Sequence, residues 1–242
     1  MDDRLFRDAY DIAFDALQAK SDDDTAAVLR RAGALLECEH PLFGIQVSLA
    51  PERQVQRIVS LFPADYQLTY AKEEFIFVDP TVVHCLTRLD LKVWDSSMYS
   101  GSGALRMRDA AADAGLQYGF SVPNRHGEGS ISMISFGCDR PMPAKRMELL
   151  AKLAAVIGAG LHSAAENHVV PGLFEEKRPS LSARETECLK WLTAGKTDSE
   201  IGEIMSLSEE TVRQYVKRVK QKFNIYSRPQ AAAYAIRYRF VT

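Results

Sequence analysis

Cationic side chains are concentrated in one short segment near the C-terminus. The segment 206–223 reads SLSEETVRQYVKRVKQKF. At about 100° per residue of an α-helix, Arg213, Lys217 and Lys220 share one face, and Gln214 lies beside them. Lysine and arginine neutralise phosphates, and arginine and glutamine can also hydrogen-bond to base edges. This is the chemistry of DNA binding, although a cationic helix face can also be merely solvated.

The opposite side of the same segment is apolar. Its four apolar side chains form a narrow stripe at helical spacing: Val212, Val216, Val219 and Phe223. We therefore expect a helix that packs against its own domain through this stripe and leaves its cations exposed to solvent.

Helix-start signals place two further helices before the cationic one. Ser182 with Glu185 and Thr197 with Glu200 each match a capping box, in which side chains satisfy backbone amides at a helix start. Ser208 is a third N-cap residue. Short helices joined by brief turns predict a helix-turn-helix, whose exposed helix fits the major groove of DNA.

The charge of the chain is unevenly distributed. The whole chain has a net charge of −2, but residues 177–242 contain 13 Lys and Arg against 7 Asp and Glu, so the remainder carries −8. This split favours a module that binds a polyanion over a solvated helix face. The predicted DNA-binding residues are Thr197, Ser208, Thr211, Arg213, Gln214, Lys217, Arg218 and Lys220.

The C-terminal segment resembles a known DNA-binding domain along its whole length. Residues 181–223, LSARETECLKWLTAGKTDSEIGEIMSLSEETVRQYVKRVKQKF, are similar to the GerE-type helix-turn-helix of the LuxR family. Tyr215 stands where that family often has histidine, and Phe223 where it often has leucine. The resemblance implies a fourth helix over 227–239 that helps to pair two such domains on a two-fold symmetric DNA operator.

The residues before this module alternate between helical and strand patterns. We expect an α+β fold, an N-terminal α/β/α sandwich around an antiparallel sheet, followed by a small all-α four-helix helix-turn-helix domain. The expected domains are 1–168 for ligand binding and dimerisation and 180–242 for DNA binding, with a linker over 169–179. The expected helices cover 3–19, 23–37, 65–76, 106–116 and 143–166, and the expected strands cover 42–50, 56–62 and a hairpin over 117–137.

A second resemblance lies in the N-terminal part. The segment 62–80, FPADYQLTYAKEEFIFVDP, is followed fifteen residues after Asp79 by Trp94. It resembles the pocket signature of the autoinducer-binding domain of quorum-sensing LuxR-type regulators, and the resemblance covers roughly residues 5–165. Gly119 and Pro123 match the family's glycine and proline. The ligand-binding residues that it implies are Phe62, Tyr66, Tyr70, Asp79, Pro80, Trp94 and Ser135.

These residue types suit an N-acyl-homoserine lactone, the signal that the resemblance implies. Such a molecule has an amide N–H, two carbonyls and an apolar tail, so a buried Asp79 could accept from the N–H and phenols could donate to the carbonyls. Phe75, Phe77 and Trp94 could enclose the rest. On the residues alone, Asp79 and Pro80 could instead form a surface turn.

Two substitutions leave the nature of the signal open. The family usually has tryptophan where this chain has Tyr66, and often has tyrosine where it has Phe62. The lactone could be bound through altered contacts, the signal could be another small molecule, or the regulator could be independent of ligand. A response-regulator-like protein with a degenerate receiver is a further alternative, but it requires a parallel sheet.

The sequence gives no sign of an enzyme, a cofactor or a metal site. The five histidines have no metal-binding spacing, and no nucleophile elbow, P-loop or dinucleotide fingerprint is present. The four cysteines, Cys38, Cys85, Cys138 and Cys188, lie far apart and form no CxxC pair, so we expect reduced thiols packed as small hydrophobes.

The expected location is the cytoplasm, without membrane contact. The N-terminus has acidic residues where a signal peptide needs cations. The most apolar stretch, 149–165, contains Lys152 and His162 and falls short of a spanning length, so we expect a packed helix. We predict a homodimeric, ligand-responsive transcription regulator of the quorum-sensing LuxR type, with helix 143–166 as a dimer contact.

Overall fold

The computed structural model describes residues 3–50, 53–126, 129–238 and 240–241. It divides the chain into two compact units, Met1–Pro171 and Gly172–Thr242. The boundary falls inside the segment that the sequence marks as a linker.

The N-terminal unit is built on a five-stranded sheet in the order β2-β1-β5-β4-β3. Each neighbouring pair is antiparallel, so the receiver alternative, which requires a parallel sheet, is wrong. The predicted strands and hairpin are confirmed, while the short β3 was missed. The strands are β1 (His40–Ala50), β2 (Arg53–Ser60), β3 (Lys92–Trp94), β4 (Tyr118–Arg125) and β5 (Ile131–Cys138).

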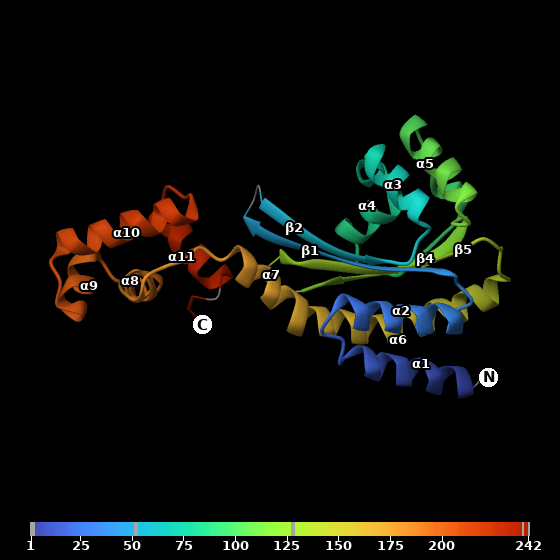
Figure 1. Cartoon of the computed structure of the whole chain (residues 1–242), viewed down its shortest axis with the longest axis horizontal. Helices are drawn as coiled ribbons and strands as arrows, with labels where there is room; N and C mark the ends of the chain where they lie inside the picture. The colour runs from blue at the N-terminus through green and yellow to red at the C-terminus, as the bar shows by residue number, and fades with distance from the viewer. Residues whose placement is uncertain (1–2, 51–52, 127–128, 239, 242) are drawn as a thin grey trace. The chain divides into compact units, whose positions relative to one another are not determined.

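Helices cover both faces of this sheet, which confirms the α/β/α sandwich (Figure 1). One face carries α1 (Asp3–Ala16), α2 (Asp22–Leu35) and α6 (Ala144–Ala164). The other carries α3 (Ala64–Lys72), α4 (Pro80–Thr87) and α5 (Ser102–Asp113), with 3-10 turns η1 (Phe75–Phe77) and η2 (Ser96–Met98) between them. The predicted helix over 65–76 ends early, at Lys72, and α4 was not predicted.

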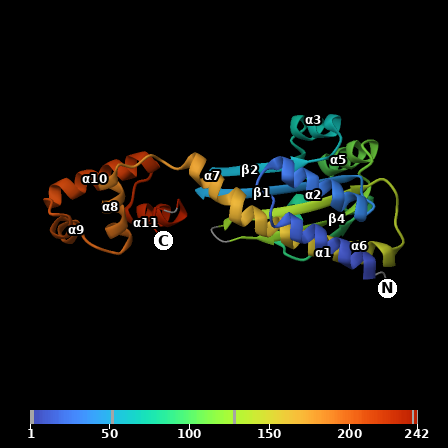
Figure 2. The same cartoon turned by 60° about the horizontal axis from the view of Figure 1, so that its bottom comes forward.

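The core of this unit lies between the sheet and α6. Phe120, Ile134 and Phe136 have no exposed surface, and the rings of Phe120 and Phe136 lie 5.5 Å apart. Helix α1 runs beside α6 (Figure 2). A Cβ on Gly160 would lie 2.2 Å from the Ala13 carbonyl oxygen, so glycine is needed for this close approach.

The expected linker is largely helical, which corrects the prediction for 169–179. A π-helical turn, η4 (Ala165–Val169), follows α6 and leads into α7 (Val170–Lys177). Pro171 has no backbone N–H, so it cannot donate the i→i−4 hydrogen bond of a regular α-helix. The π-helical turn before it is a local irregularity of the kind that occurs within α-helices. Pro171 and Gly172 thus mark an irregular helix and not a coil.

This extension also changes the length of the apolar helix. Among the described residues one helix, Ala144–Leu173, with a mean hydropathy of 1.3, is long and apolar enough to cross a membrane. The expectation that it falls short of a spanning length is therefore wrong. Leu150, Leu153 and Ile157 of this helix are completely buried in the unit, so its apolar character is explained by core packing.

The C-terminal unit is a four-helix domain, as predicted. Both predicted capping boxes form, and a third, Ser227 with Gln230, begins the last helix. A Cβ on Gly202 would lie 2.7 Å from the Leu207 carbonyl oxygen, so this glycine permits the tight turn before the cationic helix. The helices are α8 (Ala183–Thr193), α9 (Asp198–Met205), α10 (Glu209–Phe223) and α11 (Arg228–Arg237).

Candidate functional site

A cavity of about 310 Å³ lies between the sheet and the layer of α3, α4 and α5. Pro80 is not among its lining residues. It occupies the start of α4, where the missing N–H of proline costs no helical hydrogen bond. The other six predicted ligand residues line the cavity together: Phe62, Tyr66, Tyr70, Asp79, Trp94 and Ser135.

Asp79 is the buried charged group of this cavity. Its Oδ1 accepts from the backbone amides of Thr81 at 2.8 Å and Val82 at 3.3 Å, and its Oδ2 accepts from the Tyr70 hydroxyl at 2.9 Å. Only 7% of Asp79 is exposed, so the surface-turn interpretation is wrong. Burial raises the pKa of Asp79, and the hydrogen bonds from Tyr70 and the two amides oppose that rise.

The Asp79 carboxylate is well supplied with donors. It accepts from the Thr81 and Val82 amides and from the Tyr70 hydroxyl, and a hydrogen bond from the Thr81 side chain also opposes the rise in its pKa. The carboxylate therefore acts as the N-cap of α4 and also holds the Tyr70 hydroxyl at the cavity. The first role explains why the sequence places an aspartate directly before Pro80.

Two phenol groups offer donors to the cavity. Among the described residues, the hydroxyls of Tyr66 and Tyr99 make no hydrogen bond, and both residues line the cavity. Burial first, and then the charge of Asp79, raises the pKa of both phenols. Both hydroxyls therefore keep their protons at neutral pH and can donate. Tyr99 was missed because it follows a short 3-10 turn that carries no sequence pattern.

The far side of the cavity is held by a chain of polar groups on the sheet. Trp94 Nε1 donates to Ser121 Oγ at 3.1 Å, and Ser121 Oγ lies 2.7 Å from Ser135 Oγ. A Cβ on Gly119 would lie 2.4 Å from the Trp94 ring. Glycine at this position thus leaves room for the edge of the indole ring against β4. Ser121 was missed by sequence reasoning.

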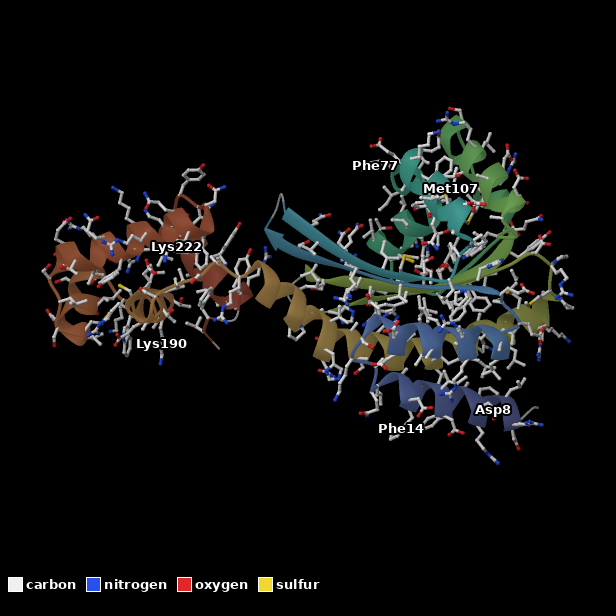
Figure 3. The ribbon with its side chains drawn as sticks, viewed as in Figure 1. Asp8, Phe14, Phe77, Met107, Lys190 and Lys222 are labelled. Atoms are coloured by element: carbon white, nitrogen blue, oxygen red, sulfur yellow. The ribbon has the colours of Figure 1, made fainter. Side chains whose placement is uncertain are left out.

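An aromatic row forms one wall. The ring centroids of Phe62, Tyr66, Tyr70 and Phe75 are spaced by 6.1, 6.0 and 6.0 Å in succession. The expectation that Phe77 helps to enclose a ligand is wrong, because 78% of Phe77 is exposed (Figure 3). Phe75 is buried but supports the wall from behind Tyr70 and is not a lining residue.

Apolar side chains from the sheet and from α5 complete the cavity. Met107, on the inner side of α5, is only 4% exposed (Figure 3). Alternation along the strands could have identified the sheet residues, once their face was known. The lining residues not predicted include Leu42, Ile58, Ile76, Val82, Met107, Leu116 and Met133.

The second candidate site is the cationic face of α10. The apolar stripe is buried as expected. Arg213, Gln214, Lys217 and Arg218 are exposed, whereas Thr211 and Lys220 are half-buried. The structure therefore presents the predicted cations and amide on one helix beside the α9–α10 turn.

These cations differ in how they are held. Arg213 pairs with Glu209 and lies 3.6 Å from Glu210. The Arg218 guanidinium lies 5.6 Å from the centre of the Tyr215 ring. Within the described part of the chain, Lys217 and Lys220 form no ion pair. These two lysines are thus available to a polyanion without breaking an intramolecular bond.

Thr197 and Ser208 both act as helix caps. The Ser208 hydroxyl accepts from the Thr211 amide at 3.1 Å and lies 2.7 Å from the Thr211 hydroxyl. The Thr197 hydroxyl donates to Glu200 at 2.9 Å. Hydrogen bonds from the Thr197 backbone and hydroxyl, with Lys196, lower the pKa of Glu200 to about 2. Thr197 and Ser208, both predicted to contact DNA, therefore have a structural role as N-caps of α9 and α10.

Lys222 belongs to the scaffold. Its Nζ donates at 2.7 Å to Glu185 on α8 (Figure 3), and the Glu185 carboxylate also accepts from the Ser182 amide at 2.7 Å. Burial alone would raise the pKa of Glu185, but the bonds from Lys222 and Ser182 lower it. This pair fastens the end of α10 to α8.

The structure also brings two histidines together in the core. Ser132 Oγ lies 2.6 Å from both His126 Nε2 and His162 Nδ1, and His126 Nδ1 lies 3.2 Å from Glu166 Oε2. This order of groups resembles that of a hydrolase triad. The Ser132 hydroxyl, however, is held between both histidines in a residue that is 1% exposed. Among the described residues, no three potential metal ligands gather.

Comparison with known families identifies both units. The autoinducer binding domain matches residues 21–164, and the domain described as bacterial regulatory proteins, luxR family, matches residues 179–235. The chain is 30% identical to the transcriptional activator protein SolR of Ralstonia nicotianae over 96% of each protein. It is 27% identical to the quorum-sensing regulator RhlR of Pseudomonas aeruginosa over 86% of each.

Solved structures agree on the fold. A crystal structure of Escherichia coli SdiA matches with a TM-score of 0.69 at 21% identity and covers 95% of each chain. An SdiA complex with octanoyl-rac-glycerol matches with a TM-score of 0.67 at 19% identity, covering 97% of this chain and 96% of that one.

A largely apolar cavity in one unit and a helix-turn-helix in the other define a ligand-binding transcription regulator. The chain belongs to the LuxR family of quorum-sensing transcriptional regulators, with an autoinducer-binding domain and a LuxR-type helix-turn-helix. This family is one of regulators and not of enzymes, which agrees with the sequence-based prediction.

Proposed function

We propose that this regulator binds an N-acyl-homoserine lactone in the N-terminal cavity. The observation that carries the proposal is the buried carboxylate of Asp79 in the wall of the cavity, together with the Tyr66 and Tyr99 hydroxyls, which have no hydrogen-bond partner among the described residues. The cavity suits a mainly apolar signal with a few polar groups, because most of its lining side chains are apolar and Asp79, Tyr66 and Tyr99 supply an acceptor and two donors.

The binding mode follows from these donors and acceptors. The amide N–H of the signal donates to Asp79, and Tyr66 and Tyr99 donate to its carbonyls. The acyl chain lies along Leu42, Ile58 and the neighbouring apolar side chains. Tyr66 thereby replaces the family's tryptophan as a donor of different reach. Phe62 adds only apolar surface to the cavity.

A non-lactone signal is the second candidate. SdiA has been crystallised with octanoyl-rac-glycerol, a molecule that has an acyl chain but no amide N–H. The glycerol hydroxyls of such a ligand can also donate to Asp79, and its ester carbonyl can accept from one of the two phenols. The lactone, with two carbonyls and an amide N–H, uses both phenols and Asp79 at once, so we rank it first.

The C-terminal unit is proposed to bind a two-fold symmetric operator as part of a homodimer in the cytoplasm, with α10 in the major groove. Lys217 and Lys220 contact phosphates, while Arg213 and Gln214 reach base edges. The expected dimer contact at α6 stays a prediction. Its apolar side chains are used inside the unit, and its exposed side chains include Lys145, Glu148 and Lys152.

Mass spectrometry of small molecules co-purified with the protein from its native host tests the identity of the signal. We expect an N-acyl-homoserine lactone in stoichiometric amount, and none with the purified C-terminal segment 172–242. Recovery of an acylglycerol or another compound without an amide would favour the second candidate. Recovery of no compound by a chain that binds its operator would indicate a regulator independent of ligand.

A further inference from the structure

The register of the sheet orders the side chains along the floor of the cavity. Residues two apart on a strand lie on the same face, so successive cross-strand pairs on that face are about 7 Å apart. Three such pairs line the cavity in succession: Leu42 with Ser135, Gly44 with Met133, and Gln46 with Gln56. The floor thus passes from a serine hydroxyl, through an apolar stretch, to a pair of side-chain amides.

Helix α4 shows that Asp79 and the two glutamines mark opposite ends of the cavity. The helix lies over the sheet (Figure 1), and Asp79 is its N-cap. Near the other end of the helix, the Leu86 carbonyl accepts from the Arg125 side chain at 2.8 Å. Arg125 pairs with Ile131, and Ile131 pairs with Gln46. Because the eight residues of α4 span about 12 Å, its start at Asp79 is about that far from the end beside the glutamines.

The two amides keep hydrogen-bonding groups for a ligand. Gln56 Nε2 donates to Gln46 Oε1 at 2.8 Å. Among the described residues, Gln46 Nε2 and Gln56 Oε1 make no hydrogen bond. Gln46 is half-buried and Gln56 is exposed, so solvent reaches both amides. The preceding stretch offers apolar contact only, from Met133 and from Ile58, which lies opposite Gly44 on β2.

We propose that Gln46 and Gln56 set the length and the terminal chemistry of the acyl chain that this regulator accepts. This rests on the proposed function, with the amide of the signal at Asp79. A methyl end that stops at Ile58 and Met133 gains apolar contact. A methyl end that reaches the glutamines displaces their water and offers no hydrogen bond in return. A terminal hydroxyl at the same place both donates and accepts, so it replaces that water.

The experiment is calorimetric titration of the full chain with two series of N-acyl-homoserine lactones of increasing acyl length, one ending in a methyl and one in a hydroxyl group. In the methyl series, affinity should rise by up to about fourfold per methylene and then fall once the chain reaches the glutamines. At the length where it falls, the hydroxyl-ended lactone should bind several-fold more tightly than the methyl-ended one.

Leucine variants separate the amides from the shape of the cavity. With Gln46→Leu and Gln56→Leu combined, the affinity maximum of the methyl series should move to a longer chain, and the preference for a terminal hydroxyl should be lost. Gln56→Leu alone, on the exposed edge strand β2, should show the same changes to a smaller extent if the double variant does not fold. Gln54→Leu is the matched control, because Gln54 lies on the same strand and face but is not a lining residue, and it should keep the wild-type profile.

The outcomes distinguish this proposal from the proposed function. Lactone binding with the same affinity maximum in the wild type and the leucine variants would overturn the role of the glutamines alone. A length limit without any preference for the hydroxyl would indicate a steric stop and would also overturn it.

If the wild type binds no lactone, the proposed function fails, and the same proteins are titrated with 1-monoacylglycerols of increasing chain length. A maximum that moves to longer chains in the leucine variants would support the role of the glutamines, and an unchanged maximum would contradict it. A wild type that binds neither series would overturn both proposals.

Discussion

At the residue scale, the same side-chain types serve both the scaffold and the sites. Asp79 caps α4 and also lines the cavity. Lys217 and Lys222 lie on one helix, yet Lys217 is exposed while Lys222 is bonded to the buried Glu185. Residue type and spacing predicted the positions, and the structure separates their roles.

The two lysines provide a matched pair of variants. Lys217→Met should leave stability unchanged and weaken operator binding, with the slope of log affinity against log salt reduced by about 1 because one phosphate contact is lost. Lys222→Met should instead lower the free energy of unfolding by about 1–2 kcal/mol, since Glu185 loses its partner. Fluorescence anisotropy with operator DNA and urea denaturation measure the two effects, and the assignment is wrong if the two variants exchange behaviours.

His162 predicts a dependence of stability on pH. Burial, and then the nearby charge of His126, lowers its pKa from 6.5 to about 4. The unfolded chain therefore binds more protons than the folded chain between these values, so stability falls as the pH is lowered through this range. The loss between pH 7 and pH 5 should be about 2 kcal/mol from this group alone.

Urea denaturation of the wild type and His162→Gln at pH 7 and pH 5 measures the contribution of His162 to this loss of stability. The hydrogen-bonded neighbours Ser132, His126 and Glu166 are present in both proteins, so the difference between the two pH profiles reports on residue 162. We expect the variant to lose markedly less stability on acidification. Parallel pH profiles for the two proteins would rule out His162 as the responsible group.

At the element scale, the cavity depends on close contacts between β4 and its neighbours. A Cβ on Gly119 would lie 2.1 Å from the Phe136 carbonyl oxygen and 2.4 Å from the Trp94 ring. Gly119→Ala should therefore displace the indole, destabilise the N-terminal unit by about 1–3 kcal/mol and reduce ligand binding. Thermal unfolding with and without ligand measures this effect. Gly172→Ala is a control, because an added Cβ on Gly172 would have nothing within 4 Å and, as at Gly119, the φ of Gly172 is not positive.

The elements also show what sequence reasoning could reach. The C-terminal helices were predictable because capping boxes mark their starts and the valine stripe marks their buried side. The short β3, only three residues long, has no periodicity to detect, and α4 carries apolar residues around most of its circumference. The π-turn before Pro171 was missed because Pro and Gly signal loops more often than irregular helices.

The candidate site also contains residues that could be predicted from the sequence and residues that could not. Six of the seven predicted ligand residues line the cavity, since four of these six come from the segment 62–80 and Trp94 follows shortly after it. Tyr99, Ser121 and the apolar lining come from other elements, and only the tertiary fold brings them there.

At the scale of the whole molecule, a signal-binding unit and a DNA-binding unit follow one another in a LuxR-family chain. A ligand that fills the cavity and satisfies Asp79 stabilises the N-terminal unit by mass action, by about 2.7 kcal/mol at a hundredfold excess over its Kd. We propose that the signal controls the regulator in this way, because ligand bound in the cavity stabilises the folded N-terminal unit. The proposal does not depend on whether the signal promotes or releases DNA binding.

The most direct test is calorimetric titration of the full chain and of Asp79→Asn with N-acyl-homoserine lactones of increasing acyl length. Asparagine keeps the N-cap of α4 but presents less acceptor capacity to the amide N–H of the signal. We predict that at least one lactone binds the wild type and that the variant binds it about tenfold to a hundredfold more weakly. Equal affinities for the two proteins, or no binding of any lactone by the wild type, would contradict the assignment of this cavity.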